Sequence, residues 1–353
     1  MLSTFSGSTK NTITRIIYKW VLHLKQVLYV DEKIKEMYEK AGYRVYKTGA
    51  VEICHWTKEA LKNKRFCYKN KFYGIDTHRC MQISLAAFWC TNRCIYCWRP
   101  NHEFQKGHID LLNEDWPDPK DLLENLRKLR AELLIGFKGN EKVDKKMLEE
   151  ALLPNHVTFS LIGEPLLYGR MDEAILYLKK SWHWLKSIFI VTNGVVYETI
   201  EKLIEKNALP TQFYISFTAP NEELFFQVSK PLLNDAWKRF NKSLKLMRHA
   251  KTRKVARITL IKGINDTDFE GWASLIEKYN PHFVEVKAFM LLGYSRQRLT
   301  IKNMPTHEEV KEFAKKLSEY IDYDLVDEHV DSRVVLLQSN KNVIDRKIRG
   351  IEQ

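Results

Sequence analysis

From residue 82 onward the chain alternates between short apolar runs and longer stretches with a helical period. The apolar runs are rich in β-branched and aromatic residues, and they lie at residues 82–89, 157–162, 187–192, 212–217, 255–261 and 283–290. The helix-period stretches lie at residues 119–135, 171–184, 197–207, 233–249, 267–279 and 306–320. Strands buried on both faces and alternating with helices are typical of repeated βα units and a parallel sheet. Six units are too few for a closed eight-stranded barrel, so we predict an α/β fold with an open (βα)6 partial TIM barrel.

Turn-forming and polar residues follow the carboxyl ends of the first four predicted strands. They form the motifs "WC" at 89–90, "GEP" at 163–165, "NG" at 193–194 and "SFTAP" at 216–220. Barrels of this kind carry their functional residues at the carboxyl ends of the strands. Gly, Asn and Pro are also ordinary loop residues, so each motif alone could be turn chemistry. Their coincidence at one rim predicts a functional site there.

All six cysteines of the chain fall within 44 consecutive residues. They are Cys54, Cys67, Cys80, Cys90, Cys94 and Cys97. A disulfide framework is usually spread through a small secreted domain, whereas cysteines confined to one segment of a 353-residue chain favour metal ligation in a reducing compartment. We therefore expect a cytoplasmic metalloprotein.

The formal net charge of +13 is large for a chain of this length. Such a field attracts polyanions, and nucleic acid is the leading candidate, although a generally basic proteome would produce the same composition. No apolar run reaches the roughly 18 residues needed to span a bilayer. The longest candidate, residues 13–30, is interrupted by Arg15, Lys19 and Lys25. We expect a nucleic-acid partner and no membrane association.

Cys90, Cys94 and Cys97 form a C-x3-C-x2-C motif in the loop after the first predicted strand. Three thiolates make an incomplete cage, because tetrahedral zinc and cubane iron–sulfur clusters normally take four protein ligands. A zinc knuckle could recruit His102 or His55 as its fourth ligand, and such knuckles bind RNA. The alternative is an open coordination position, which is typical of a catalytic metal centre.

This loop, with the aromatic Tyr96 just before its third cysteine, resembles the radical S-adenosylmethionine superfamily. The resemblance implies a 4Fe–4S cluster whose fourth iron is chelated by the amino and carboxylate groups of S-adenosylmethionine. One electron from the cluster then cleaves the sulfonium and yields a 5′-deoxyadenosyl radical, so the cofactor supplies the difficult chemistry. Tyr96 is expected beside the cofactor.

Other residues at the same rim resemble cofactor-binding positions of that superfamily. Gly163 and Glu164 are similar to a "GGE"-type motif that positions the methionine amino group, although Ile162 replaces one glycine. Asn193 and Ser216 resemble positions that contact the ribose or the carboxylate. Glu164 could instead be a carboxylate that favours the dipole of the following helix.

Cys54, Cys67 and Cys80 are spaced C-x12-C-x12-C directly upstream of the first motif. A single free cysteine is often just a small buried apolar residue, but three at equal spacing indicate a second cluster with its own open iron. The stretches EICHWTKEAL, CYKNKFYGI (67–75) and CWRP (97–100) resemble the 4-demethylwyosine synthases, and the resemblance covers residues 40–340. It implies a second 4Fe–4S cluster.

The resemblance also implies the reaction. In that family, N1-methylguanosine beside the anticodon of tRNA-Phe is condensed with carbons of pyruvate by radical chemistry. Two other interpretations remain open at this point. A glycyl-radical activase would share the first motif, but its further cysteines usually come as C-x2-C pairs. A zinc-bearing RNA-binding module would need no radical chemistry.

Two modes of pyruvate binding are compatible with the sequence. Lys69 could form a Schiff base with the ketone if its pKa were lowered, and a cationic neighbour such as Lys71 would help. The open iron of the second cluster could instead chelate the carboxylate and keto oxygens. Lys69 and Lys71 could also merely contact phosphate or the pyruvate carboxylate.

Several residues are candidates for contacts with the tRNA substrate. Arg79, Arg99 and Lys287 are candidate cations for phosphates or carboxylates, although each could be an ordinary surface charge. The target base must leave the anticodon stack, and an aromatic face such as Trp98 could hold it. Tyr73 and Phe72 are nearby aromatics, and Phe72 is equally suited to the core.

The predicted organisation has four parts. Residues 1–40 form an N-terminal extension with a basic amphipathic helix, either an organelle transit peptide or a helix packed on the protein body. Residues 41–81 carry the second cluster, 82–340 form the radical-type partial barrel, and 341–353 are a basic tail, a solvated helix or an RNA contact. C-terminal additions include a strand at 333–339. Without a flavodoxin-like domain, the resemblance implies an external electron donor of flavodoxin or ferredoxin type; we expect a monomer.

Overall fold

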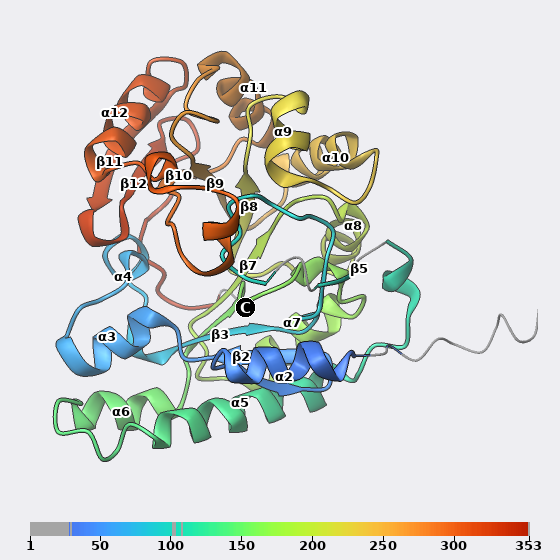
Figure 1. Ribbon diagram of the computed structural model, residues 1–353, viewed down its shortest axis with the longest axis vertical. Helices are drawn as coiled ribbons and strands as arrows, with labels where there is room; N and C mark the ends of the chain where they lie inside the picture. The colour runs from blue at the N-terminus through green and yellow to red at the C-terminus, as the bar shows by residue number, and fades with distance from the viewer. Residues whose placement is uncertain (1–27, 29, 101–103, 107–108, 352–353) are drawn as a thin grey trace, which may run out of the picture.

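The computed structural model describes residues 28, 30–100, 104–106 and 109–351 (Figure 1). The basic amphipathic helix predicted near the N-terminus lies in residues outside this set. The first helix within it is α2 (Glu32–Lys40), whose N-cap Asp31 accepts a hydrogen bond from Lys33 N at 2.9 Å. Among the described residues, no helix combines the length and apolar character required to traverse a lipid bilayer.

A ten-stranded mixed sheet forms the centre of the molecule, in the order β1-β2-β3-β6-β7-β8-β9-β10-β12-β11. Six neighbouring strands are parallel: β3 (Cys80–Ser84), β6 (His156–Phe159), β7 (Ser187–Thr192), β8 (Gln212–Phe217), β9 (Arg253–Leu260) and β10 (Phe283–Ala288). Antiparallel strands extend both edges: β1 (Arg44–Tyr46), β2 (Gly49–Glu52), β11 (Tyr323–His329) and β12 (Val334–Ser339). The sheet curves without closing, which confirms the predicted open partial barrel.

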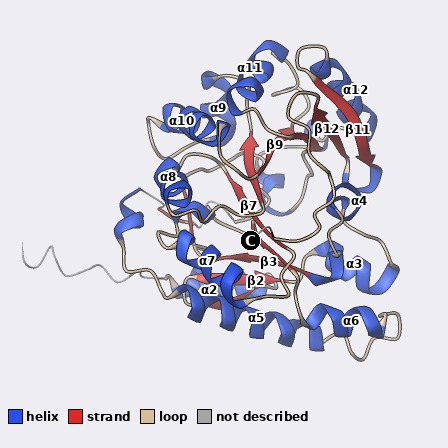
Figure 2. Cartoon of the chain, turned by 180° about the vertical axis from the view of Figure 1, so that it is seen from behind, coloured by secondary structure: helices blue, strands red, loops and turns tan. Residues whose placement is uncertain are grey.

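The helices cover the outside of the curved sheet (Figure 2). Those that follow or connect the parallel strands are α5 (Pro119–Ile135), α6 (Lys145–Leu152), α7 (Met171–Ser181), α8 (Tyr197–Glu205), α9 (Glu222–Ser229), α10 (Ala236–Arg248), α11 (Phe269–Tyr279) and α12 (His307–Ser318). Two short helices, α3 (His55–Asn63) and α4 (Tyr68–Tyr73), lie between β2 and β3. They form the part of the chain that carries the upstream cysteines.

Alternate residues of the strands belong to two different cores. Ile188 and Ile190 of β7 pack in the main core beneath the helices. Phe189, the residue between them, packs with Tyr214 of β8 and Phe72 of α4 in a second cluster on the opposite face of the sheet. Because side chains alternate along a strand, the second set lines the inside of the barrel.

The first predicted strand, residues 82–89, is wrong in its bounds. The strand β3 ends at Ser84, and Trp89–Cys90 forms a separate short strand, β4, which pairs with β5 (Gln105–Lys106). Between them, residues 85–88 form a buried turn in which Ala87 N donates to Thr48 O at 2.9 Å. An apolar run signals burial, and burial alone does not distinguish a strand from a packed turn.

The basic tail is not the solvated helix that was one of its two predicted forms. Residues 341–351 contain no helix and lie against α4 and the sheet. Ile348 N donates to Tyr73 O at 2.9 Å, and Arg346 pairs with Asp327 of β11 at 2.8 Å. Ile348 also packs against the apolar cluster that contains Phe72 and Tyr73 of α4. The tail therefore helps to hold α4 in place.

Candidate active site

Cys90, Cys94 and Cys97 lie in one loop at the carboxyl end of the parallel strands. All three side chains are partly exposed and none forms a disulfide. The pKa of each thiol is raised to about 12, mainly by burial and in part by a neighbouring thiol of the triad. Three thiols that disfavour one another's ionisation are suited to a metal cluster, whose positive charge offsets the thiolates.

Backbone contacts fix the shape of this loop. Ile95 N donates to Val228 O at 2.9 Å. Arg298 Nε donates to Ile95 O at 3.0 Å, and its guanidinium also donates to Cys97 O. Tyr96 packs beside these residues against an apolar cluster that includes Val228. The loop is therefore held by α9 and by the segment that follows β10.

The predicted motif after β6 lies directly against this loop. Gly163 has φ +74°, and a Cβ on it would lie 2.4 Å from Ala86 O and 2.7 Å from Trp89 O. Glu164 N donates to Trp89 O at 2.9 Å. The structure thus brings Gly163 and Glu164 to the start of the cysteine loop, as their positions at one rim suggested.

The Glu164 carboxylate is buried and its contacts lie within the protein. Its Oε1 accepts from Thr192 Oγ1 at 2.6 Å and from Leu166 N at 3.1 Å, and its Oε2 accepts from Asn193 N at 2.9 Å. Burial raises its pKa to about 7. These bonds match the alternative in which Glu164 caps a helix start, here a short 3-10 turn at Pro165–Leu167. Asn193 Nδ2 in turn donates to Thr91 Oγ1 at 2.8 Å, inside the cysteine loop.

The upstream cysteines come from three different elements. Cys54 is the N-cap of α3, Cys67 is the N-cap of α4, and Cys80 is the first residue of β3. Cys54 Sγ accepts from Thr57 N at 3.3 Å. Burial raises the pKa of Cys67 to about 11 and that of Cys80 to about 12, and the Cys54 thiol adds to both shifts. The influence of the Cys54 thiol on the other two indicates that the three cysteines are neighbours in space.

The two triads lie toward opposite ends of the same parallel strands. Cys80 begins β3 at its amino end, whereas the loop of Cys90 follows its carboxyl end. Cys54 and Cys67 stand at the N-termini of α3 and α4. Within the described residues, no three His, Cys, Asp or Glu side chains are arranged to share one metal ion.

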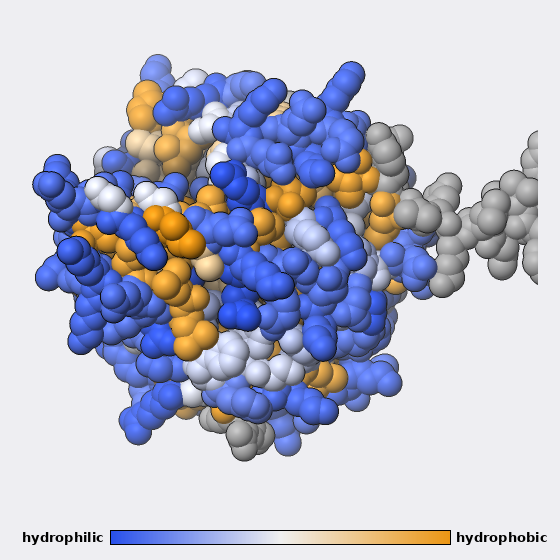
Figure 3. Space-filling view, turned by 90° about the horizontal axis from the view of Figure 1, so that it is seen from below, coloured by the Kyte–Doolittle hydropathy of each residue, from blue (hydrophilic) through white to orange (hydrophobic). Residues whose placement is uncertain are grey.

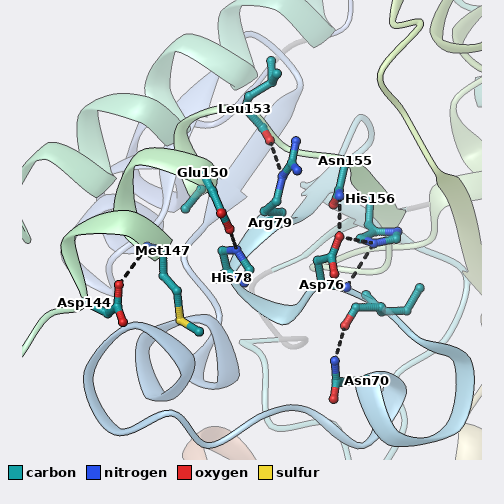
Figure 4. Close-up of polar contacts among 12 residues, drawn as sticks. Asn70, Asp76, His78, Arg79, Asp144, Met147, Glu150, Leu153, Asn155 and His156 are labelled. Carbon is teal, nitrogen blue, oxygen red and sulfur yellow. Dashed lines mark hydrogen bonds and ion pairs between the residues drawn. The ribbon is translucent and has the colours of Figure 1, made fainter.

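The segment between Cys67 and Cys80 is fastened to the amino ends of the strands (Figure 4). Asp76 Oδ2 accepts from Asn155 Nδ2 at 2.6 Å and from Lys186 Nζ at 3.0 Å. Asp76 N donates to His156 Nε2 at 3.1 Å. Asn70 Nδ2 donates to Ile75 O at 2.9 Å and closes the turn after α4. These contacts fix the position of α4 beneath the barrel.

Lys69 extends from α4 toward the inside of the barrel. Its Nζ lies 4.8 Å from the ring centroid of Phe189 and 5.0 Å from that of Tyr214. Burial, with a contribution from the nearby Arg257, lowers the pKa of the Lys69 ammonium. Arg257, and not the expected Lys71, is thus the cationic neighbour that lowers it.

Two other predicted cations, Lys71 and Arg79, have partners within the protein. Lys71 is exposed and pairs with Asp327 at 3.0 Å, on the side of α4 that faces β11. Arg79 Nε donates to Leu153 O at 3.1 Å, near the amino ends of the strands (Figure 4). These placements put both side chains apart from Lys69.

Trp98 and Arg99 form a stack beside the cysteine loop. Trp98 is 44% exposed, whereas Arg99 is only 6% exposed. The Arg99 guanidinium carbon lies 3.5 Å from the Trp98 ring centroid, and its Nη1 pairs with Glu52 Oε2 at 3.0 Å and contacts Tyr43. Arg99 therefore supports one face of Trp98 and does not present a free cation at the rim.

A polar cluster inside the barrel was missed by the sequence reasoning. Glu285 is fully buried, and its carboxylate accepts from Tyr73 Oη at 2.7 Å, Arg257 Nε at 3.0 Å and Tyr68 Oη at 3.1 Å. Ser216 lies in register with Arg257, and Arg257 with Glu285, so these three residues form one row. Charged residues inside otherwise apolar strand runs were the available signal.

Two family models match the chain. The model of the radical SAM superfamily matches residues 86–276, and the model for wyosine base formation matches residues 278–339. The first match spans the cysteine loop and strands β6 to β9, and it covers more than half of the chain. The fold and the cysteine loop thus define a radical SAM protein, a class that uses S-adenosylmethionine and a 4Fe–4S cluster.

Individual relatives narrow this class. The chain is 44% identical to the S-adenosyl-L-methionine-dependent tRNA 4-demethylwyosine synthase of Pyrococcus horikoshii, over 92% of this chain and 93% of the relative. It is 35% identical to the Methanocaldococcus jannaschii synthase, over 90% of this chain and 100% of the relative. The chain belongs to the family of S-adenosyl-L-methionine-dependent tRNA 4-demethylwyosine synthases.

Two solved structures share the fold over nearly their whole length. One is TYW1 with a lysine-pyruvate adduct bound, with a TM-score of 0.80 and 33% identity over 90% of this chain and 99% of that chain. The other is archaeal TYW1, with a TM-score of 0.73 and 32% identity over 90% of this chain and 100% of that chain.

Proposed function

We propose that this enzyme builds 4-demethylwyosine on tRNA-Phe, by condensing N1-methylguanosine beside the anticodon with carbons of pyruvate. The observation that carries the proposal is that one barrel carries two cysteine triads, toward opposite ends of its parallel strands, with Lys69 in its interior, in a chain of this family. A glycyl-radical activase or a zinc-bearing RNA-binding module would have no use for the second triad and Lys69 in this arrangement.

Cys90, Cys94 and Cys97 hold the 4Fe–4S cluster that binds S-adenosylmethionine. When bound, the cluster and S-adenosylmethionine would together supply the 5′-deoxyadenosyl radical for hydrogen abstraction from the N-methyl group. Gly163 lets the end of β6 approach the loop, and Glu164 locks that end to Asn193. Tyr96, which packs in the cysteine loop, and Ser216, which lies in the interior row with Arg257, would contact the cofactor.

Cys54, Cys67 and Cys80 hold a second 4Fe–4S cluster at the other end of the strands. Two observations support this assignment. Cys54 and Cys67 each cap a helix, and Cys80 shares their electrostatic environment. The segment between Cys67 and Cys80 is fixed by Asp76 and its partners (Figure 4).

Lys69 carries pyruvate as a Schiff base. Its amine lies between the rings of Phe189 and Tyr214, inside the barrel. A lysine in such surroundings is suited to attack a ketone. The lysine-pyruvate adduct in TYW1, which shares this fold, supports a lysine over chelation by the second cluster alone.

The tRNA contributes its anticodon loop to the carboxyl rim. The exposed face of Trp98, backed by Arg99, offers a stacking surface for the extruded base. Lys71 and Arg79 are at most peripheral phosphate contacts, because both bond within the protein. The enzyme acts as a monomer in the cytoplasm. It receives electrons from an external donor of flavodoxin or ferredoxin type.

Two triple variants test the proposal. Replacing Cys90, Cys94 and Cys97 by Ala should abolish reductive cleavage of S-adenosylmethionine. Replacing Cys54, Cys67 and Cys80 by Ala should halve the iron content, spare that cleavage and abolish 4-demethylwyosine formation. Circular dichroism must first show that each variant folds, because metal binding and folding are coupled.

One outcome would overturn the two-cluster assignment. A folded variant lacking Cys54, Cys67 and Cys80 that keeps all its iron and still modifies tRNA would rule it out. The Lys69 assignment has its own test: borohydride with labelled pyruvate should attach label at Lys69 of the parent and leave none on Lys69→Ala.

A further inference from the structure

Charged side chains are unusual inside a barrel, and this one holds four of them on neighbouring elements. Arg257 of β9 and Glu285 of β10 lie in register, and Lys287 lies one side-chain row nearer the carboxyl ends. Lys69 reaches the same interior from α4. Three partly exposed cations thus lie near one fully buried carboxylate, and it is the carboxylate that most requires a partner.

Glu285 satisfies only one of these cations. Its Oε2 accepts from Arg257 Nε at 3.0 Å, and the two tyrosines Tyr68 and Tyr73 complete its hydrogen bonds. Arg257 also donates to Tyr68 Oη at 2.7 Å and lies 4.5 Å from the Tyr214 ring centroid. Arg257 and Glu285 therefore form a closed pair.

Lys287 has no such partner. Among the described residues, no carboxylate lies within ion-pair distance of its Nζ. The Nζ donates to Ser332 O at 3.2 Å and lies 5.0 Å from the Tyr68 ring centroid. Burial and the nearby Arg257 lower the pKa of Lys287. A protonated amine held by one carbonyl and one aromatic face has donors to spare.

The Lys287 ammonium lies beside Tyr68, and the charge of Lys69 contributes to lowering the pKa of Lys287. Tyr68 directly precedes Lys69 on α4, and its ring faces the Lys287 ammonium. Lys69 and Lys287 both act to lower the pKa of Cys67, and Arg257 acts to lower the pKa of both lysines. The region that supplies Glu285 and Lys287 is the one matched by the model for wyosine base formation, beyond the general radical SAM match.

We propose that Lys287 binds the carboxylate of the 2-oxo acid that condenses with Lys69. The inference rests on the proposed function, because it assumes the Schiff base at Lys69. In that step the Lys69 amine adds to the C2 carbonyl carbon, and the carbonyl oxygen leaves as water. The C1 carboxylate keeps its charge and needs a cation, which Lys287 supplies.

A purely structural role for Lys287 makes a different prediction. A cation near Cys67 could serve only to neutralise the thiolates of the second triad. In that case Lys287→Gln would lose iron and would weaken the binding of any ketone equally. A carboxylate-binding role affects charged ketones alone.

The test compares pyruvate with pyruvamide, which has the same ketone but no charge. Borohydride trapping at Lys69 is measured against the concentration of each compound in the iron-loaded parent, in Lys287→Gln and in Lys287→Arg. Lys238→Gln, which removes an exposed charge on α10, is the matched control. Iron content and circular dichroism are recorded for all four proteins.

We expect the half-saturating pyruvate concentration to rise at least tenfold in Lys287→Gln, while that of pyruvamide stays within about twofold. Lys287→Arg should recover most of the preference for pyruvate, and Lys238→Gln should match the parent. Equal effects on both compounds, no effect on either, or loss of iron would overturn the inference and leave the Lys69 assignment intact. A parent that traps neither compound would overturn the Lys69 assignment and this inference together.

Discussion

Gly163 occupies a position that other residues do not tolerate. Its φ of +74° disfavours any side chain, and a Cβ would meet two main-chain oxygens at 2.4 and 2.7 Å. We expect Gly163→Ala to lower the free energy of unfolding by more than about 2 kcal/mol. Denaturant titration measures this. Gly139→Ala is the control, because nothing lies within 4 Å of its added Cβ, and its change should stay within about 0.5 kcal/mol.

His282 makes the stability depend on pH. Burial lowers its pKa from 6.5 to about 4, and its Nδ1 accepts from Lys254 N at 2.9 Å. Between these values the unfolded chain takes up a proton that the folded protein does not, so stability falls as the pH drops from 6.5 toward 4. His282→Asn should flatten this dependence by about 1 kcal/mol between pH 7.5 and 5.5. If the free energy of unfolding changed equally with pH in the parent and the variant, His282 would not be the source of the pH dependence.

Spacing and residue type were enough to name candidate site residues but not their surroundings, and the roles assigned to those residues stay predictions. Both cysteine triads, Lys69 and the Gly163–Glu164 motif could be named because spacing and residue type carry their chemistry. The burial of Arg99 against Glu52 could not be foreseen, because the two residues are far apart in the chain. Arg257 was overlooked for the same reason, since its partner Glu285 comes from a different strand.

At the scale of elements, the segment after β10 holds the first cysteine loop. Arg298 donates to the carbonyls of Ile95 and Cys97. Arg298→Ala would leave these acceptors without their charged donor, at a cost of about 1–3 kcal/mol to the loop conformation. We expect the rate of reductive S-adenosylmethionine cleavage to fall at least tenfold, with a smaller loss of iron.

Arg296→Ala is the matched control for this variant. Arg296 lies two residues away, is exposed, and makes only a long contact of 3.4 Å with Leu291 O. It should cleave S-adenosylmethionine at the parent rate. Equal losses in the two variants would show that the general charge of the segment matters and that the Arg298 contacts do not.

Element bounds were predicted well where helices and strands alternate regularly. The strands at 187–192 and 212–217 and the helix at 119–135 have the predicted bounds. The antiparallel strands β1, β2 and β11 were not predicted, because three to seven residues with mixed polarity carry little periodic signal. Their pairing depends on the neighbouring edge strands, which only the folded sheet supplies.

At the scale of the whole molecule, the net charge of +13 should govern binding of tRNA. The face in Figure 3 is mostly hydrophilic, with apolar residues confined to separate patches. Cationic side chains that bind phosphates release the counterions condensed on the RNA. We therefore expect log affinity for tRNA-Phe to fall linearly with log salt concentration. Fluorescence titrations at several salt concentrations measure the slope. A slope near zero would refute an electrostatic contribution.

The same titration with tRNA that lacks the N1-methyl group provides the control. The salt slope should be the same for both, since the phosphates do not change. Any difference in affinity at fixed salt then reports contacts with the base itself, such as stacking on Trp98.

The two triads differ in how far apart their cysteines lie along the chain, and this difference affects how the enzyme matures. Cys90, Cys94 and Cys97 span eight residues of one loop, so a nascent or partly folded chain already presents all three thiols. Cys54, Cys67 and Cys80 meet only after α3, α4 and β3 have docked. If each triad holds a 4Fe–4S cluster, as we propose, iron–sulfur assembly would meet a peptide-like acceptor for one cluster and a folded protein for the other. On gradual unfolding, iron should leave in two stages, with the cluster of the dispersed triad lost first.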